Sequence, residues 1–227
     1  MRDYPSHSRS GSIYMHIPDG VLSTPVLVTT GLLAAGGVAN GLRKIEHEQI
    51  PKVAMLAATF FVASLIHVPI GPVSSHLLLN GLMGFLIGWA AFPALLVALL
   101  LQAFFFGFGG ITSLGANVLN MALPAVAVYY LFSRRINHAS SRQKVFMTAF
   151  SAGVLAIFLT CFTATLTLVA SGKEFIGAVT MIYLAHLPIM IIEGFVTGSV
   201  MVFLHKTRPE LFQPPLVYPG IEGKIYA

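Results

Sequence analysis

The chain has 227 residues, of which 56% are hydrophobic and 9% are charged, and its formal net charge is +5. Soluble domains carry about 25% charged residues, so this composition excludes an ordinary soluble protein and is typical of a polytopic membrane protein. A single cysteine excludes an internal disulfide framework and a cysteine-rich zinc site, and basic residues gathered at the ends of apolar segments argue against nucleic-acid binding.

The apolar segments predict an all-α fold, a polytopic bundle of about seven transmembrane helices. Small residues four apart, as in Gly37/Gly41 and Gly194/Gly198, predict close packing between these helices. Only the turn from Trp89 to Pro93 separates the third and fourth spans. The expected spans cover residues 23–42, 51–68, 75–91, 93–107, 114–132, 146–170 and 176–204.

The positive charges predict the orientation of the bundle. With the N-terminus outside and the C-terminus in the cytoplasm, only Arg2, Arg9 and Lys173 of the 13 lysines and arginines lie outside, as the positive-inside rule favours. This orientation places His16, His67 and the region around residue 109 at the outer face. The sequence therefore predicts a concentration of polar groups there.

The peptide Met15–Gly20, with the sequence MHIPDG, lies just before the first apolar span. In a chain that begins at Met15, the α-amine of Met15, the amide of His16 and Nδ1 of the His16 ring are adjacent nitrogens. One metal ion can bind all three through small chelate rings, so little chain entropy is lost. Planar nitrogen ligation with one position open is typical of Ni²⁺ or Cu²⁺. The alternative is an incidental histidine in a juxtamembrane loop.

Residues 1–14 are polar and lack the apolar region of a secretory signal. Because a residue before Met15 would turn its α-amine into an amide, we expect 1–14 to be a non-native start or a segment that is removed. Residues 15–206 are expected to form the transmembrane metal-binding domain, and residues 207–227 a cytoplasmic tail.

His76 is the expected fourth nitrogen ligand. Ser74 or Ser75 is suited to cap the third span, which would place His76 in the first helical turn. The helix dipole there favours the neutral imidazole that binds metal. A hydrogen-bonded interfacial histidine is the alternative, Ser75 is a candidate to support the ligands, and His67 is a reserve ligand or hydrogen-bond donor.

Further polar residues at the same face are candidates to support the ligands. Asp19 either bonds a ligand nitrogen or closes its own Asp-Gly turn. Gly109 and Gly110 predict a tight loop before the fifth span. Asn117 and Asn120 share a helix face, so they either anchor the Met-His peptide or join neighbouring helices.

His186 and Glu193 lie seven positions apart in the last span and therefore share a face. Ionisable residues inside a membrane are costly and are often functional. A polar contact that locks the bundle is the favoured interpretation, and a proton relay is the alternative. The chain has no HExxH, GxSxG or phosphate-loop motif, which argues against hydrolytic metal, serine or nucleotide chemistry in this chain.

Four segments resemble one known family. They are MHIPDG at 15–20, SSHLLLNG at 74–81, FGGITSLGANVLNMALPA at 108–125 and AHLPIMIIEGFVTG at 185–198. The chain is similar, from Met15 to about Lys206, to the substrate-binding membrane components of energy-coupling-factor transporters for cobalt and nickel, the CbiM/NikM family. It differs in carrying 14 residues ahead of the Met-His pair, and in having Ser75 where many members have glycine.

The resemblance implies that Met15 supplies its α-amine, His16 its amide and ring nitrogens, and His76 a further nitrogen to the transported ion, Ni²⁺ or Co²⁺. It also implies a multi-pass protein of the cytoplasmic membrane linked to nickel uptake or cobalamin biosynthesis. The implied partners are a CbiQ/NikQ-like transmembrane coupling subunit and a CbiO/NikO-like ATP-binding-cassette ATPase, with or without a small accessory membrane subunit.

We therefore expect the substrate-capture component of an importer for Ni²⁺ or Co²⁺, and not an enzyme. Two alternatives come from other classes. One is an intramembrane enzyme that uses His186 and Glu193, and the other is a structural membrane subunit that binds no metal.

Overall fold

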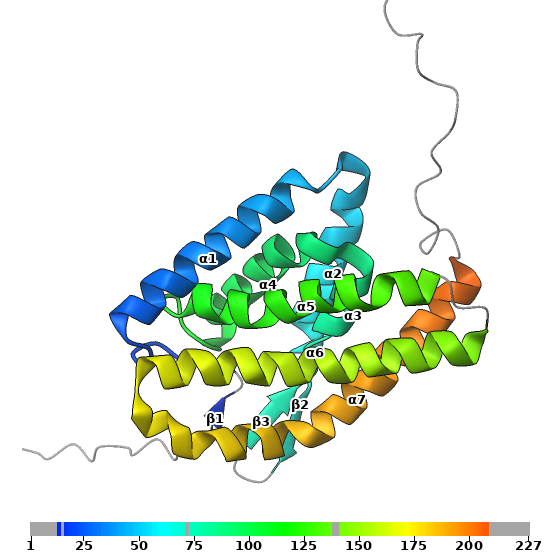
Figure 1. Ribbon diagram of the computed structural model, residues 1–227. Helices are drawn as coiled ribbons and strands as arrows, with labels where there is room; N and C mark the ends of the chain where they lie inside the picture. Colours follow the sequence, from blue (N-terminus) through cyan, green and yellow to red (C-terminus); the bar gives the residue numbers. More distant parts are fainter. Residues whose placement is uncertain (1–12, 15, 71–72, 138–140, 209–227) are drawn as a thin grey trace, which may run out of the picture.

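The computed structural model describes residues 13–14, 16–70, 73–137 and 141–208 (Figure 1). Its helices are α1 (Thr24–Arg43), α2 (Ile50–Ala63), α3 (Asn80–Ile87), α4 (Ala91–Phe106), α5 (Leu114–Asn137), α6 (Arg142–Ser171) and α7 (Ala178–Thr207). The 3-10 turns are η1 (His47–Gln49), η2 (Gly88–Ala90) and η3 (Lys173–Gly177). The strands are β1 (Ile13–Tyr14), β2 (His67–Ile70) and β3 (Val73–His76).

The helical membrane fold is confirmed. Among the described residues, five helical segments are long and apolar enough to cross a membrane: Thr24–Arg43, Asn80–Phe106, Leu114–Ser133, Arg142–Ser171 and Val179–Thr207. α2 has 14 residues, fewer than the roughly 20 that a perpendicular span needs. The turn expected near Trp89 is η2, which divides α3 from α4.

The expected close packing between helices is also present. α6 and α7 run side by side along one face of the bundle, with α5 against α6 (Figure 1). A Cβ on Gly194 or Gly198 would lie 2.9 Å from the ring of Phe150 or Phe146, respectively. The two glycines therefore let α7 approach α6 at a distance that a larger residue would prevent.

The bundle has two distinct ends. At one end, which we call the histidine end, α1 begins, α6 ends and α7 begins, and Ser23 N–H donates to Ser171 Oγ across 3.3 Å. At the other, which we call the basic end, α1 finishes at Arg43 and α6 starts at Arg142. Since α1 has 20 residues, the two ends are about 30 Å apart at 1.5 Å per residue.

Residues 67–70 and 73–76 pair as antiparallel strands instead of forming the helix ends expected there. β3 is the central strand of a small sheet of order β1-β3-β2, and His67 pairs with His76 in its register. Prolines at 69 and 72 oppose a helix, and the β-branched residues Val68, Ile70 and Val73 favour strands. The expectations of a helix reaching 68 and of His76 in a first helical turn are therefore wrong.

Candidate functional site

The peptide that carries His16 is held by the beginning of α5. Ile17 N–H donates to Asn117 Oδ1 at 3.0 Å, and Asn117 Nδ2 donates back to the Ile17 carbonyl at 3.0 Å. The Ser113 hydroxyl donates to the same carbonyl at 2.6 Å. Asn117 thus pairs with the backbone of Ile17 as a neighbouring strand would, and these buried bonds fix the residue that follows His16.

Asp19 fixes the other side of the peptide. Its carboxylate accepts from the Thr112 hydroxyl at 2.5 Å and from the backbone N–H groups of Thr112, Ser113 and Ile111 at 2.9, 3.2 and 3.2 Å. These groups belong to the loop that leads into α5, where a negative charge also suits the positive end of the helix dipole. The hydroxyl of Thr112, followed by the backbone donors, lowers the pKa of Asp19 below its usual 3.8 despite some desolvation.

This pKa shift has a testable consequence. Because the pKa of Asp19 is lowered by folding, its contribution to stability is present above about pH 3.8 and is lost as the pH falls below that value. Asp19→Asn is expected to lower the melting temperature slightly at neutral pH, and the difference from the wild type should shrink as the pH falls below about 3.8. Thermal unfolding of both proteins across this range is the measurement. A difference that persists at the acidic limit would contradict the assignment.

His16 and His76 face each other in the interior. Their exposed fractions are 3% and 2%, their ring centroids are 5.0 Å apart, and Nε2 of one lies 3.0 Å from Nε2 of the other. His76 Nδ1 lies 2.9 Å from the carbonyl of Leu77, which can only accept, so we assign the proton to that Nδ1. His16 Nε2–H then donates to His76 Nε2, and the lone pair of neutral His16 is on Nδ1.

The segment that follows His76 is anchored by α7. Glu193, with no exposed surface, accepts through Oε1 from the backbone N–H of Leu78 and, at 2.8 Å, from that of Leu79. Leu79 adopts φ +49°, a left-handed conformation that is unfavourable for a branched side chain. The Glu193 carboxyl group therefore stabilises the turn by which the chain passes from His76 in β3 into α3.

Gly109 closes the site beside His16. It has φ +73°, and a Cβ there would lie 3.0 Å from Asn117 Nδ2 and 3.2 Å from the Cβ of His16. Any side chain at this position would push against both the histidine and the asparagine that anchors its peptide. The tight loop expected from Gly109 and Gly110 is thus the wall of the site.

A comparison of substitutions at two glycines tests whether the site requires the absence of a side chain at Gly109. Gly109→Ala is expected to weaken metal binding roughly 10-fold, since displacing groups around a ligand typically costs 10- to 100-fold. Gly107→Ala is the matched control, because Gly107 also has positive φ (+65°) but has no atom near its Cβ position within 4 Å. The control should lower stability by about 1–2 kcal/mol and leave affinity unchanged. Equal affinities of the two variants for Ni²⁺, measured by calorimetry, would exclude this role.

The remaining predicted residues fall into different places. Met15 lies outside the described residues, as do residues 1–12 and 209–227. His67 lies in β2 and Ser75 in β3, with side chains that the structure does not describe. Asn120 joins α5 to α6, where its Oδ1 accepts from the Thr167 hydroxyl at 3.0 Å. It therefore does not share the role of Asn117.

His186 and Glu193 each bond to a different group. His186 Nδ1 lies 2.6 Å from the carbonyl of Ile182 in its own helix, whereas Glu193 bonds to the turn at residues 78–79. Sequence reasoning missed two contributors to the site: the Ser113 hydroxyl and the contact of Glu193 with the turn. The Gly109-Gly110 pair was the sequence signal for the tight loop beside His16, whereas these two contacts had no signal in the sequence.

The described side chains do not by themselves make a metal site. Within residues 16–70, 73–137 and 141–208, no group of three or more His, Cys, Asp or Glu residues is arranged to hold an ion. Two buried imidazoles that face each other supply two nitrogens. A complete set of ligands would need further donors beside these two imidazoles.

Comparisons with known proteins agree on one kind of protein. Residues 16–211 match the family model described as "Cobalt uptake substrate-specific transmembrane region". A "Putative metal transport protein" of Haemophilus influenzae is 41% identical over 198 residues, which cover 87% of this chain and 96% of that protein. A "Fused nickel transport protein NikMN" of Rhodobacter capsulatus is 35% identical, over 88% of this chain and 64% of that protein.

The fold has a counterpart among solved structures. The crystal structure of a truncated transition metal transporter aligns with a TM-score of 0.64 over 84% of this chain and 98% of that chain, at 23% identity. This likeness shows that the two chains share a fold.

Proposed function

Because this chain belongs to the CbiM family of cobalt-uptake transmembrane proteins, we propose that it captures Ni²⁺ or Co²⁺ through Met15, His16 and His76. The chain is a multi-pass membrane component of cobalt or nickel transport and not an enzyme. The observation that carries the finer proposal is the pair of buried imidazoles with Nε2 atoms 3.0 Å apart.

The ion would be held by four nitrogens in a plane: the α-amine of Met15, the amide and Nδ1 of His16, and a ring nitrogen of His76. Two nitrogens bound to one ion at about 2.0–2.1 Å and at right angles are about 2.9 Å apart. This is close to the 3.0 Å between the Nε2 atoms of His16 and His76. Nε2 is the His16 atom that faces His76, so ligation through Nδ1 requires the His16 ring to rotate. The ion then takes the place of the hydrogen bond between the two rings, and the His16 proton stays on Nε2.

Anchoring of the peptide supports this arrangement. Asn117, Ser113 and Asp19 hold the residues just after His16 to α5, so little further order is needed when the ion binds. Both metals accept these nitrogens, and the stability order favours nickel over cobalt without deciding which one the cell supplies.

The proposal extends to an energy-coupling-factor importer. This chain carries no phosphate-loop motif, so the energy for transport would come from a CbiO/NikO-like ATPase through a CbiQ/NikQ-like coupling subunit, with or without a small accessory subunit. The protein would lie in the cytoplasmic membrane with the histidine end outside, as its distribution of basic residues favours. Movement of the whole subunit by its partners would then release the ion inward.

The experiment compares three forms of the protein in detergent. They are the full 227-residue chain, the chain that begins at Met15, and the Met15 form with His16→Ala. Nickel and cobalt binding are measured by calorimetry, with the N-terminus of each form checked by mass spectrometry. The Met15 form is expected to bind at least 100-fold more tightly than the other two, since each of them lacks a direct ligand. Equal binding by all three would overturn the chelate.

A further inference from the structure

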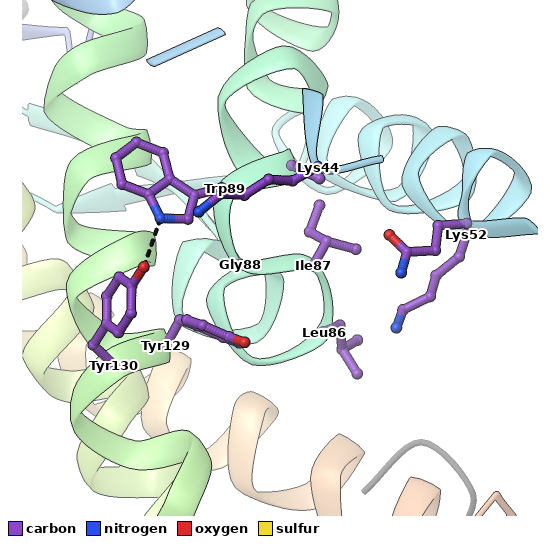
Figure 2. Close-up of a pocket in the computed structure, with 10 residues that line it drawn as sticks. Lys44, Lys52, Leu86, Ile87, Gly88, Trp89, Tyr129 and Tyr130 are labelled. Carbon is purple, nitrogen blue, oxygen red and sulfur yellow. Dashed lines mark hydrogen bonds between the residues drawn. The ribbon is translucent and has the colours of Figure 1, made fainter. Parts of the chain in front are cut away.

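A cavity lies at the basic end, about 20 Å from the His16 peptide by the rise of α5 from Asn117, which holds that peptide, to Tyr130, which lines the cavity. It has a volume of about 310 Å³ and lies where the end of α1, the start of α2, the α3–α4 turn and α5 meet (Figure 2). None of the residues that hold the His16 peptide lines it. The cavity is therefore separate from the proposed ion site.

Aromatic side chains give this cavity a fixed wall. Trp89 Nε1–H donates to the Tyr130 hydroxyl at 2.9 Å, as the dashed line in Figure 2 shows. The Lys44 ammonium group lies 5.1 Å from the centre of the Trp89 ring, within the range of a cation–π contact. Gly88, with φ +50°, lets the chain turn close against the ring of Tyr129. One cation is thus held in place over the aromatic wall.

The charge of the cavity is one-sided. Lys44 and Lys52 come from separate elements and lie on opposite sides of Ile87 in Figure 2. The other polar lining residues are Gln49 and the aromatic residues Trp89, Tyr129 and Tyr130, and no lining residue carries a carboxylate. Two ammonium groups beside neutral hydrogen-bonding groups suit an anion with several oxygen acceptors, such as a phosphate.

The position of the cavity indicates what carries that phosphate. Trp and Tyr together mark the level of lipid headgroups in membrane proteins, and basic pockets at this level bind anionic lipids. Next to the cavity, Leu42 and Ile50 expose 57% and 49% of their surface, which gives acyl chains an apolar surface to follow. The cavity therefore combines an anion site with an adjacent path for hydrocarbon.

We propose that the Lys44–Lys52–Trp89 cavity binds the phosphate headgroup of an anionic phospholipid at the basic end of the bundle. The lipid phosphate lies between the two ammonium groups, and its acyl chains extend over the exposed ends of α1 and α2. A bound lipid of this kind would brace the α3–α4 turn, where the membrane helix is interrupted.

The chain has a single tryptophan, and it lies in this cavity, so its fluorescence reports occupancy directly. The full-length protein is placed in vesicles of phosphatidylcholine with a minor fraction of phosphatidylglycerol. In two matched preparations, the same mole fraction of either phosphatidylglycerol or phosphatidylcholine carries brominated chains that quench tryptophan. The brominated phosphatidylglycerol is expected to quench Trp89 more strongly than the brominated phosphatidylcholine. Lys44→Gln with Lys52→Gln should reduce this preference roughly 10- to 30-fold.

Arg142→Gln with Lys144→Gln is the matched control, because it removes two charges from the same end without touching the cavity. It should keep the preference. Equal quenching by both lipids in the wild type would overturn the proposal, even if a variant fails to fold. If inorganic phosphate abolishes the preference, the ligand of the cavity is a free anion and not a lipid. Absence of preference, together with loss of co-purifying coupling subunit in the double variant, would assign the cavity to an acidic protein segment instead.

Discussion

His76→Ala, made in the chain that begins at Met15, is expected to lower the affinity for Ni²⁺ or Co²⁺ by roughly 100-fold or more, because removal even of residues behind the ligands typically costs 10- to 100-fold. The Nε2 of His76 lies 3.0 Å from that of His16 in a buried site. Calorimetry with each ion is the measurement. Stability should fall much less than affinity, since Leu77 and Leu78 remain to fill the interior.

His67→Ala is the control for this experiment. His67 pairs with His76 in the β2–β3 register, so both substitutions are made in the same hairpin and remove the same group. The His67 variant should retain the affinity of the wild type to within a few-fold. His16→Ala combined with His76→Ala should be little worse than either alone, because ligands of one ion act together and their effects do not add. A larger loss in the His67 variant would transfer the ligand role to His67.

The long helices were the most predictable part of the fold. α1, α5, α6 and α7 each begin within about one turn of the position expected from their apolar runs, because such long runs have no other stable form in a membrane. The pairing of residues 67–70 with residues 73–76 was not predictable in the same way. A short apolar run with prolines is ambiguous by periodicity alone, and its form depends on pairing between strands and on support from α7, far away in the sequence.

The candidate site also combines features that were predictable from the sequence with others that depend on contacts between distant segments. The nitrogens of His16 and the importance of His76 follow from residue chemistry and from the family resemblance, and the position of Asn117 in the first turns of α5 made it a candidate anchor. That Asn117 binds Ile17 while Asn120 binds Thr167 depends on which helices pack together. The partner of Glu193 is 115 residues away, and no local pattern indicates such a contact.

Glu193→Ala is expected to affect both stability and metal binding, although Glu193 is not a proposed ligand. Its carboxyl group accepts from the N–H groups of Leu78 and Leu79, and removing a buried acceptor costs about 1–3 kcal/mol for each donor left unpaired. The left-handed Leu79 would then relax, and His76 would move with the turn. We expect a marked decrease in melting temperature and a loss of metal affinity of roughly 10- to 100-fold.

Two further variants separate positioning from general destabilisation. Glu193→Gln keeps an oxygen acceptor for both N–H groups, so its affinity should stay within about 10-fold of the wild type. Thr197→Val, one turn further along α7, removes a fully buried hydroxyl that has no hydrogen-bond partner among the described residues, so it should change neither quantity appreciably. If Glu193→Ala is destabilised but binds Ni²⁺ as tightly as the wild type, the turn does not position His76, and Glu193 serves only to join α7 to the hairpin.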